Sequence, residues 1–483
     1  MNRKAVIRSL GIVLLCEAGF MIPSLVIALY FKDGDALSFL LTIGLLILIG
    51  GLLSLVRPGK TGLYARDGLA IVSLGWLAMS FFGAMPFFLS GAIPKPVDAL
   101  FESVSGFTTT GASILTVIEG MPRGILFWRS FTHWIGGMGV LLLTLAILPL
   151  AGAGAVHILR AESPGPSPGK LVPRLAATAK ILYLLYIALT LAQVIALLLA
   201  GMSLFDALIH AFGTAGTGGF SNRNLSVGAY ASLPVNLIIS VFMLLFGVSF
   251  SLHYQALKGN WRVYLKDEEL RFYLTLVVAS VALITWDVWR HQIMAPGASL
   301  EHAFFQVSSI ITTTGYSTVD FNTWPTLSKS VLILLMFIGA SAGSTGGGIK
   351  CIRILMMFKM IRREMTRMKH PQIVQGIRVS KVTVEQDILG ATTLFILFYL
   401  VILVFAVFIV AAESADLVTG FTAVLACLSN IGPGLEMVGP ASNYSAFSPH
   451  SKLILSLCML IGRLEIMPVV LLALPSFWRR VSH

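Results

Sequence analysis

The sequence predicts an all-α polytopic membrane protein in which a fourfold internal repeat surrounds a central pore. Two observations predict the membrane: 56% of the 483 residues are hydrophobic and 12% are charged, and apolar runs of about eighteen or more residues recur along the chain. A third observation predicts the repeat. Four short polar segments centred on glycine interrupt the apolar runs roughly every hundred residues.

These four segments, which we call the glycine loops, share one pattern. They read Thr-Thr-Thr-Gly-Ala-Ser, Thr-Gly-Gly-Phe-Ser, Thr-Thr-Thr-Gly-Tyr-Ser and Ser-Asn-Ile-Gly-Pro-Gly, and they begin at Thr108, Thr217, Thr312 and Ser429. Their aligned glycines are Gly111, Gly219, Gly315 and Gly432, at intervals of 108, 96 and 117 residues. Each loop therefore marks one copy of a repeat.

The net charge of +12 could suggest a nucleic-acid-binding protein, but the positions of the basic residues argue against it. Most of the 34 Lys and Arg residues fall in six segments that share one side of a membrane if the N-terminus is cytoplasmic. These segments are 3–8, 57–66, 160–180, 258–271, 350–381 and 479–480. The bias follows the positive-inside rule, so we expect a cytoplasmic N-terminus and no nucleic-acid partner.

Two apolar spans, at 7–31 and 37–56, precede the repeats and are joined by a short turn at 32–35. No glycine loop lies between them, so they stand outside the fourfold repeat. Glu17 lies within the first span, where a charge would cost about 2.5–3.5 kcal/mol. We expect this side chain to face protein, and we favour a structural role over a place in an ion path.

From Asp67 onward, a module repeats: an apolar span, a short segment, a glycine loop and a second span. The first spans are expected at 68–89, 179–200, 272–289 and 389–410, and the second at 127–150, 234–257, 327–357 and 453–474. Residues 1–66 then hold the N-terminal spans, and the repeats cover 67–160, 161–258, 259–365 and 366–483. An even total of ten transmembrane helices returns both termini to the cytoplasm.

The short segments are predicted to be re-entrant helices. They begin near Asp98, Asp206, Glu301 and Asp416, between 13 and 16 residues ahead of the loop glycine. At about 1.5 Å per residue, such a helix reaches only halfway across a bilayer core of about 30 Å. Its C-terminal end carries partial negative charge, so four ends that converge favour a cation. We favour N-capping as the role of the carboxylates over attraction of cations, and both roles can hold together.

Irregular backbone survives at membrane depth only where it lines a cavity or is buried in protein. Glycine lets carbonyl oxygens turn inward, and rings of such oxygens can replace the hydration shell of a monovalent cation. Four equivalent loops make this interpretation stronger than helix packing by small residues. The predicted ion ligands are Thr110, Gly111, Gly218, Gly219, Thr314, Gly315, Ile431 and Gly432, with a second tier at Thr109, Thr217, Thr313 and Asn430.

The four loops, the small-residue stretch 339–350 and Gly462-Arg463-Leu464-Glu465 together resemble the Trk/Ktr/HKT family of potassium transporters, and most closely the bacterial TrkH and TrkG type. The likeness covers essentially the whole chain. In that family each repeat resembles a two-helix potassium-channel subunit, and glycine in all four loops goes with potassium. Gly111 keeps this form, whereas the fourth loop departs most because Asn430-Ile431-Gly432-Pro433 lacks the threonines.

The resemblance also implies partners and a location. Family members are homodimers of the bacterial inner membrane, and they bind a cytosolic nucleotide-binding subunit of the TrkA type. This chain contains no dinucleotide fingerprint after a strand and no phosphate-binding P-loop. We therefore expect no cofactor on this chain beyond transported K⁺, with rubidium and, more weakly, sodium as further ions, and we expect nucleotide on the partner. The basic stretch 359–381 is interpreted first as lipid-facing and second as a docking region.

A gate is predicted in the second span of the third repeat. Its glycine-rich run breaks any helix, since each interior glycine costs about 1 kcal/mol relative to alanine. By resemblance this loop lies beneath the filter, and the gate residues are Gly343, Ser344, Thr345, Gly346, Gly347, Gly348 and Arg463. Residues two apart on a helix do not face each other, so Glu465 is not expected to pair with Arg463.

Three functions were weighed. A selective, gated pore for potassium uptake agrees best with the loops. The alternative is a potassium symporter coupled to H⁺ or Na⁺, for which Glu17, His133 and Glu465 are the candidate titratable groups. An enzyme is not expected, because the sequence shows neither a metal-ligand cluster nor a nucleophile with a nearby base.

Overall fold

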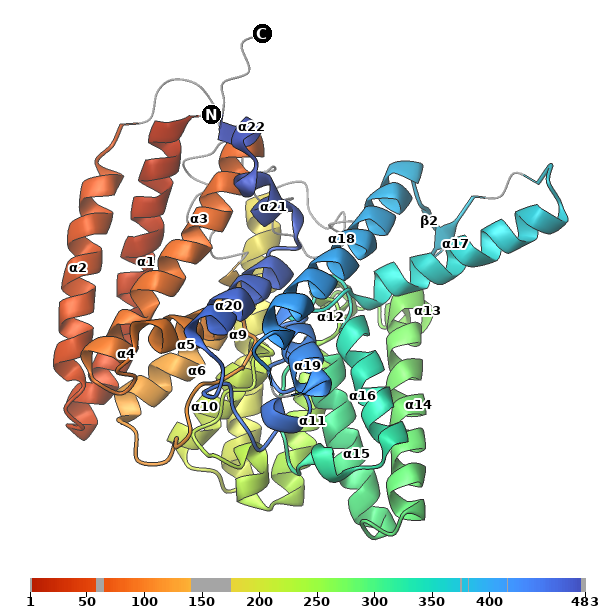
Figure 1. The fold of residues 1–483 in the computed structure, drawn as a ribbon, viewed down its shortest axis with the longest axis horizontal. Helices are drawn as coiled ribbons and strands as arrows, with labels where there is room; N and C mark the ends of the chain where they lie inside the picture. The colour runs from red at the N-terminus through yellow and green to blue at the C-terminus, as the bar shows by residue number, and fades with distance from the viewer. Residues whose placement is uncertain are drawn as a thin grey trace.

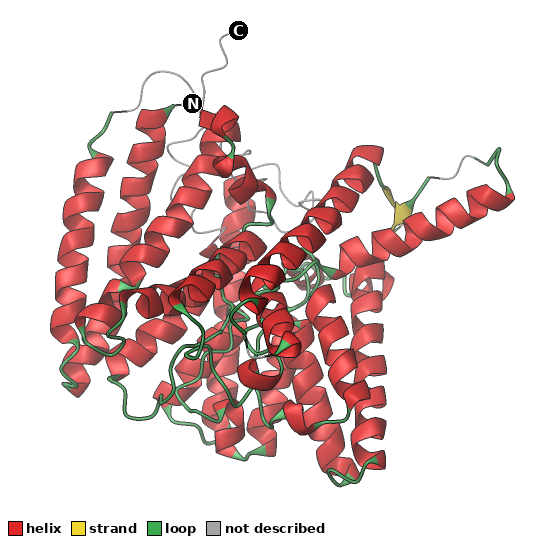
Figure 2. Cartoon of the chain, viewed as in Figure 1, coloured by secondary structure: helices red, strands yellow, loops and turns green. Residues whose placement is uncertain are grey.

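The computed structural model describes residues 2–57, 65–139, 175–373, 376–380, 382–414 and 416–478. These residues are helical apart from loops and one antiparallel hairpin, formed by β1 (Arg378–Val379) and β2 (Val382–Thr383) (Figure 2). Residues 140–150 of one predicted span, most of the 160–180 segment and the 479–480 basic pair lie outside the described residues.

The two N-terminal helices, α1 (Arg3–Phe31) and α2 (Ala36–Ser54), lie side by side at one edge of the molecule (Figure 1). They approach closely at glycine, because a Cβ on Gly11 would lie 2.7 Å from the carbonyl oxygen of Gly50. The turn between them caps a helix of the first repeat. The carboxylates of Asp33 and Asp35 accept hydrogen bonds from the backbone N–H groups of Arg123 and Ile125, each at 3.0 Å.

The first helix of each module agrees with the sequence prediction. These helices are α3 (Ala65–Gly83) with its short continuation α4 (Met85–Leu89), α9 (Leu175–Leu199), α14 (Glu268–Arg290) and α18 (Gln386–Ala411). The outer face of α18 exposes large apolar side chains, such as Leu397, Phe405 and Phe408. So much exposed apolar surface on long apolar helices is typical of a multi-pass membrane protein.

Four short helices follow, where the sequence predicts them: α5 (Pro96–Phe107), α10 (Leu204–Ala215), α15 (Pro296–Ile311) and α19 (Leu417–Leu428). The Asp416 carboxylate caps α19 by accepting from the Thr419 N–H at 2.7 Å. The expected acidic start is wrong for α15. That helix begins at Pro296, and Glu301 lies inside it and accepts from the Asn236 amide at 2.8 Å.

Two of the predicted second spans are broken helices, which the sequence did not indicate. In the second repeat, α11 (Leu233–Phe246) and α12 (Phe250–Leu257) meet at a bend of 94°. In the fourth, α20 (Pro449–Arg463) is separated from α21 (Met467–Ala473) by left-handed residues Glu465 and Ile466. The spans predicted at 234–257 and 453–474 are therefore each formed by two helices with a break between them.

In the first repeat, α6 runs from Arg123 to Gly137. In the third, α16 (Thr326–Ile338) ends at a loop, as predicted, and α17 (Cys351–Lys369) follows. Helix α17 and the hairpin project as an arm from the body (Figure 1). The remaining short helices are α13 (Arg262–Lys266), α22 (Pro475–Trp478) and the 3₁₀ turns η2 (Ser226–Tyr230), η3 (Phe321–Thr323) and η4 (Glu436–Val438).

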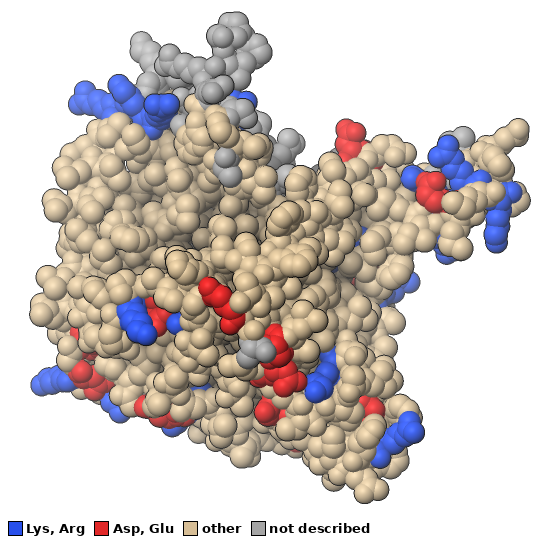
Figure 3. All heavy atoms as spheres, in the orientation of Figure 1, with Lys and Arg blue, Asp and Glu red and all other residues tan. Residues whose placement is uncertain are grey.

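Within the described residues, six helices are long and apolar enough to cross a membrane, or seven if the bent pair α11–α12 counts as one span. The second helices are mostly too short or too broken to meet that length. On the face in Figure 3, Lys and Arg gather near the N-terminal end and along the α17 arm, and an area almost free of charge separates the N-terminal group from the charges of the lower half.

Candidate functional site

Each short helix ends in the same turn, and this turn sets the conformation of the glycine loop. The residue two before the loop glycine is left-handed, with φ of 56°, 55°, 59° and 56° at Thr109, Thr217, Thr313 and Asn430. The next residue donates its N–H to the carbonyl five residues earlier at 2.8–2.9 Å. These pairs are Thr110 with Ser105, Gly218 with Gly213, Thr314 with Ser309 and Ile431 with Ala426. This is a Schellman end with asparagine or threonine at the left-handed position.

The loop glycines are left-handed as well, with φ of 79°, 79°, 82° and 95° at Gly111, Gly219, Gly315 and Gly432. Other residues rarely adopt this conformation. The fourth loop, which differs most in sequence, therefore has the same backbone pattern as the other three. Loss of its threonines changes side chains and leaves the main chain unchanged.

The four loops form a closed ring, as the space around their glycines shows. A Cβ on Gly111 would overlap the carbonyl oxygen of Gly218, and one on Gly219 would overlap that of Thr314. A Cβ on Gly315 would overlap the carbonyl oxygen of Ile431, and one on Gly432 would lie 2.6 Å from that of Thr110. Each loop thus packs its glycine against the next loop in order. We call the carbonyl groups of Thr110, Gly218, Thr314 and Ile431 the carbonyl ring.

The second-tier residues are buried at the same ring but make different contacts. The Asn430 amide nitrogen donates to the Thr110 hydroxyl at 3.0 Å and to the Met459 carbonyl at 2.9 Å, so it links the fourth loop to the first. The Thr313 hydroxyl accepts from the Gly347 N–H at 2.6 Å. The Thr217 hydroxyl donates to the Gly216 carbonyl at 2.6 Å. Two of these side chains therefore act as struts, which residue type alone did not indicate.

The loop of residues 339–350, which we call the gate loop, contacts the ring directly. It turns at Gly339, Gly343 and Gly348, with φ between 73° and 74°. A Cβ on Gly347 would overlap the Ser429 carbonyl of the fourth loop. The Gly343 carbonyl accepts from the Phe250 N–H at 3.0 Å, so the gate loop also binds the α11–α12 bend.

Arg463 connects the gate loop to the first repeat. Its guanidinium donates to the carbonyl of Thr345 at 2.9 Å and to the carbonyl of Gly136 at 2.6 Å. Both partners lie on other segments, as expected. Glu465 does not face it and instead pairs with Arg353 of α17 at 2.6 Å. The ammonium group of Lys350 donates to the Gly346 carbonyl and so closes the gate loop on itself.

Glu269 is a gate-loop contact that the sequence interpretation missed. One carboxylate oxygen accepts from the Ala342 N–H at 2.6 Å and from the Ile352 N–H at 3.2 Å. It therefore joins the gate loop and the first turn of α17, which follows that loop, to α14. The available signal was its position, because Glu269 is an acidic residue at the edge of an apolar span.

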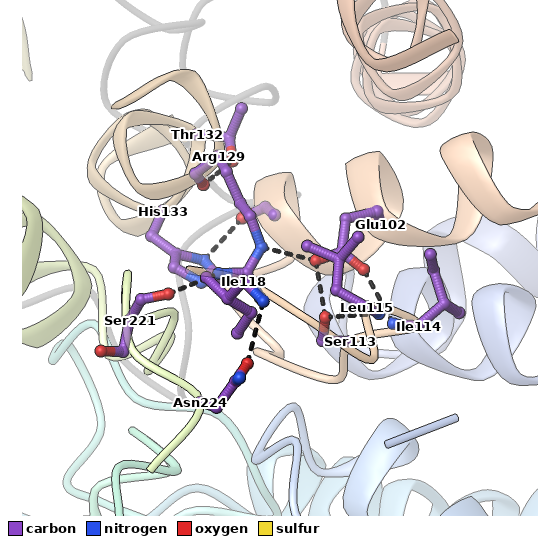
Figure 4. A network of polar contacts seen from close by, with 11 residues as sticks. Glu102, Ser113, Ile114, Leu115, Ile118, Arg129, Thr132, His133, Ser221 and Asn224 are labelled. Atoms are coloured by element: carbon purple, nitrogen blue, oxygen red, sulfur yellow. Dashed lines mark hydrogen bonds and ion pairs between the residues drawn. The ribbon is translucent and has the colours of Figure 1, made fainter. Parts of the chain in front are cut away.

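Glu102 of α5 and Arg129 of α6 were missed too (Figure 4). The Arg129 Nε donates to Glu102 Oε1 at 2.6 Å, and both side chains are almost fully buried. Nearby, His133 Nδ1 lies 2.9 Å from the Gly106 carbonyl oxygen. Among the described residues, no group of three or more His, Cys, Asp or Glu side chains could hold a metal ion.

Comparison with known proteins agrees with this geometry. A family model described as a TrkH cation transport protein matches residues 37–480. The chain belongs to the TrkH family of cation transport proteins. It is 39% identical to the Trk system potassium uptake protein TrkH of Salmonella typhimurium over 99% of this chain and 100% of that protein. It is 34% identical to TrkG of Escherichia coli K12, with 95% of each chain covered.

A solved structure shows the same fold. The crystal structure of the potassium transporter TrkH from Vibrio parahaemolyticus superposes with a TM-score of 0.90 at 35% sequence identity, and the match covers 99% of this chain and 100% of the other. The likeness therefore extends over nearly the whole of both chains. The predicted family is confirmed.

Proposed function

We propose that this protein takes up potassium through a selective, gated pore whose narrow part is the carbonyl ring. The observation that carries the proposal is the closed order of the four loops, in which each glycine lies against the carbonyl preceding the next loop's glycine. Four modules around one axis, ten spans and four re-entrant helices are the architecture that goes with this ring. The relatives named as potassium uptake proteins support the choice of ion.

The chemistry of the ring suits a weakly hydrated monovalent cation. Carbonyl dipoles can replace the hydration shell of K⁺, and the C-terminal ends of α5, α10, α15 and α19 add partial negative charge at the same place. The predicted ligands are the eight residues at and just before the loop glycines, and all eight lie at this ring. Rubidium should pass similarly, and sodium less well.

The gate loop is proposed to open and close the path below the ring. It binds Thr313 of the third loop and Arg463 of α20, and these contacts hold it across the space next to the ring. Opening requires that the loop exchange these hydrogen bonds for others. The free energy needed is a few kcal/mol, because a neutral hydrogen bond contributes about 0.5–1.5 kcal/mol net and one to a charged group such as Arg463 about 1.5–3 kcal/mol.

We also propose a multi-pass location in the bacterial inner membrane with both termini cytoplasmic, a homodimeric assembly and a cytosolic TrkA-type partner that carries the nucleotide. The basic arm formed by α17 and the hairpin supports a cytoplasmic docking region. The positive-inside bias supports the orientation. The basic arm and the positive-inside bias are observations that do not depend on the carbonyl ring.

The alternative, coupled symport, rests on His133. The imidazole of this residue lies against the backbone of Gly218, where a Cβ would overlap the ring atoms. A titratable group in contact with a glycine loop is what coupling to H⁺ would need. Glu465 is the weaker candidate, since it is already paired with Arg353.

Reversal potentials of the purified protein in vesicles separate the two functions. With K⁺, Na⁺ and pH gradients varied one at a time, a pore predicts a potential that follows the K⁺ gradient alone. A potential that shifts with pH, and stops shifting in His133→Gln, would favour symport. Absence of K⁺ flux in the presence and absence of a TrkA-type subunit would contradict both.

A further inference from the structure

Behind the carbonyl ring, one buried ion pair connects the exits of the first two glycine loops. Glu102 accepts from the Ser113 hydroxyl at 2.9 Å and the Ile114 N–H at 3.0 Å, and both residues follow Gly111. Arg129 donates to the Ser221 carbonyl at 2.9 Å, just after Gly219. With the 2.6 Å contact between Glu102 and Arg129, these bonds form one continuous bridge (Figure 4).

The arginine also fixes an aromatic ring next to the second loop. Its guanidinium carbon lies 3.6 Å from the centre of the Phe220 ring, and Phe220 directly follows Gly219. On the same ring, the His133 imidazole has its centre 4.1 Å away. A planar guanidinium that both stacks and donates in fixed directions restricts its neighbours more than a lysine would.

The equivalent position in the other loops has no such pair. Nine residues before the loop glycine, the four repeats carry Glu102, His210, Gln306 and Ala423. His210 Nε2 lies 3.0 Å from the Ser221 hydroxyl. In the second repeat an imidazole therefore contacts the serine two residues after the loop glycine, whereas in the first repeat the Glu102 carboxylate contacts the corresponding Ser113. The Gln306 amide has no hydrogen-bond partner within the described residues. The ion pair is thus a feature of one boundary of the ring and does not follow from the repeat.

A buried ion pair is a poor source of stability, because removing two charges from water offsets their attraction. What this pair supplies is direction and separation, since its hydrogen bonds end on the Ser113 hydroxyl, the Ile114 N–H and the Ser221 carbonyl, which lie two or three residues after a loop glycine. Resting on the proposed function, we propose that Glu102 and Arg129 are positioning residues for selectivity. They hold the first two quarters of the carbonyl ring at the spacing that suits K⁺ and disfavours Na⁺.

The test is the K⁺ over Na⁺ permeability ratio, measured from bi-ionic reversal potentials in vesicles containing the full-length protein. Glu102→Gln and Arg129→Gln should each lower the ratio by about tenfold, which corresponds to the ~1.4 kcal/mol expected from loss of a charge-assisted hydrogen bond. The double variant should be no worse than either single variant, because the two side chains act as one unit. Arg129→Lys keeps the charge without the planar fork and should fall between.

Asp287→Asn is the matched control. Asp287 is a similarly buried carboxylate that accepts from the Ser328 hydroxyl of α16 at 2.6 Å, and within the described residues it forms no hydrogen bond to a glycine loop. The K⁺ over Na⁺ permeability ratio of the Asp287→Asn variant should match that of the unaltered protein. The inference is overturned if folded Glu102→Gln or Arg129→Lys keeps the normal ratio, or if Asp287→Asn loses it equally. If the unaltered protein shows no K⁺ preference, the proposed function itself fails and the inference with it.

Discussion

The first and third glycine loops share the core Thr-Thr-Thr-Gly and one backbone conformation, yet different groups hold them. The first loop is fixed from behind by Glu102, which pairs with Arg129. At the equivalent place behind the third loop, the Gln306 amide has no hydrogen-bond partner within the described chain. The third loop is instead tied to the gate loop, through the bond between Thr313 and Gly347.

The comparison shows that loops with the same backbone conformation can be held by different side chains in different repeats. Identical main-chain geometry at all four glycines gives the carbonyl ring its size. Unlike supports then tie the first loop to Glu102 and Arg129 and the third loop to the gate loop, the segment that we propose moves. Changes to the shared backbone should therefore act alike in both loops, whereas changes to the supports should act in only one.

The largest effect is expected where the two loops are the same. Gly111→Ser and Gly315→Ser both place a Cβ on a left-handed residue, where it overlaps a carbonyl of the neighbouring loop. Strain of this kind exceeds ~1.4 kcal/mol, so each should lower the K⁺ over Na⁺ permeability ratio by about tenfold or more.

Gly297→Ala of α15 serves as the control, because a Cβ there meets no atom within 4 Å. The K⁺ over Na⁺ permeability ratio of this variant, measured from bi-ionic potentials, should equal that of the unaltered protein. Normal selectivity in Gly315→Ser would contradict the ring.

The next effect concerns the gate alone. Glu269→Gln weakens the bonds to Ala342 and Ile352, so the gate loop should leave its closed position more often. Loss of a charged acceptor costs about 1.5–3 kcal/mol, enough to raise the K⁺ flux of the closed protein about tenfold.

Rubidium uptake into vesicles measures this flux, and the permeability ratio should stay normal. Glu413→Gln, an exposed change near the start of α19, should alter neither. A Glu269→Gln protein with unaltered flux would show that α14 does not hold the gate loop shut.

A smaller effect should distinguish the two loops directly. Thr313→Val removes the hydroxyl that accepts from Gly347, at a cost of about 1 kcal/mol, and should raise closed-state flux by roughly fivefold. Thr109→Val makes the same change in the first loop, to which the gate loop forms no hydrogen bond through Thr109 within the described part of the chain. Flux that rises equally in both variants would remove the distinction between the loops.

The smallest effect is expected at the cap of α19. Hydrogen bonds from Thr419 lower the pKa of Asp416 below its ordinary value of 3.8. The folded state is thus stabilised above that value and loses the contribution as pH falls through the lowered pKa. Asp416→Ala should cost about 0.5–1 kcal/mol of unfolding free energy at neutral pH, and Asp416→Asn much less, because asparagine also caps helices. Thermal unfolding at two pH values measures both.

Much of this fold could be predicted because its signals are local. Apolar run lengths located the first helices, and a glycine behind each short helix located the loops. The breaks in the second helices of the second and fourth repeats could not be predicted, unlike the glycine-rich break of the third, since they depend on distant contacts. A Cβ on Gly247 would lie 2.7 Å from the Tyr273 hydroxyl, and no local pattern shows that α14 passes there.

The side-chain supports were missed for the same reason. Arg129 is 27 residues from Glu102 and 92 from Ser221, so only the folded chain shows the bridge. Asn430 remains a predicted second-tier residue, and its hydrogen bond to Thr110 joins two residues that are 320 positions apart. Residue type predicted the chemistry of the loops. Packing decides which of their side chains form hydrogen bonds within the protein, and the sequence does not show that packing.

The most direct test of the central claim is a crystal structure of the protein grown with rubidium, with anomalous scattering used to locate the ion. The account predicts a peak on the axis between the carbonyl groups of Thr110, Gly218, Thr314 and Ile431, and loss of that peak in Gly315→Ser. Rubidium bound elsewhere in the protein, with none at the carbonyl ring, would contradict it.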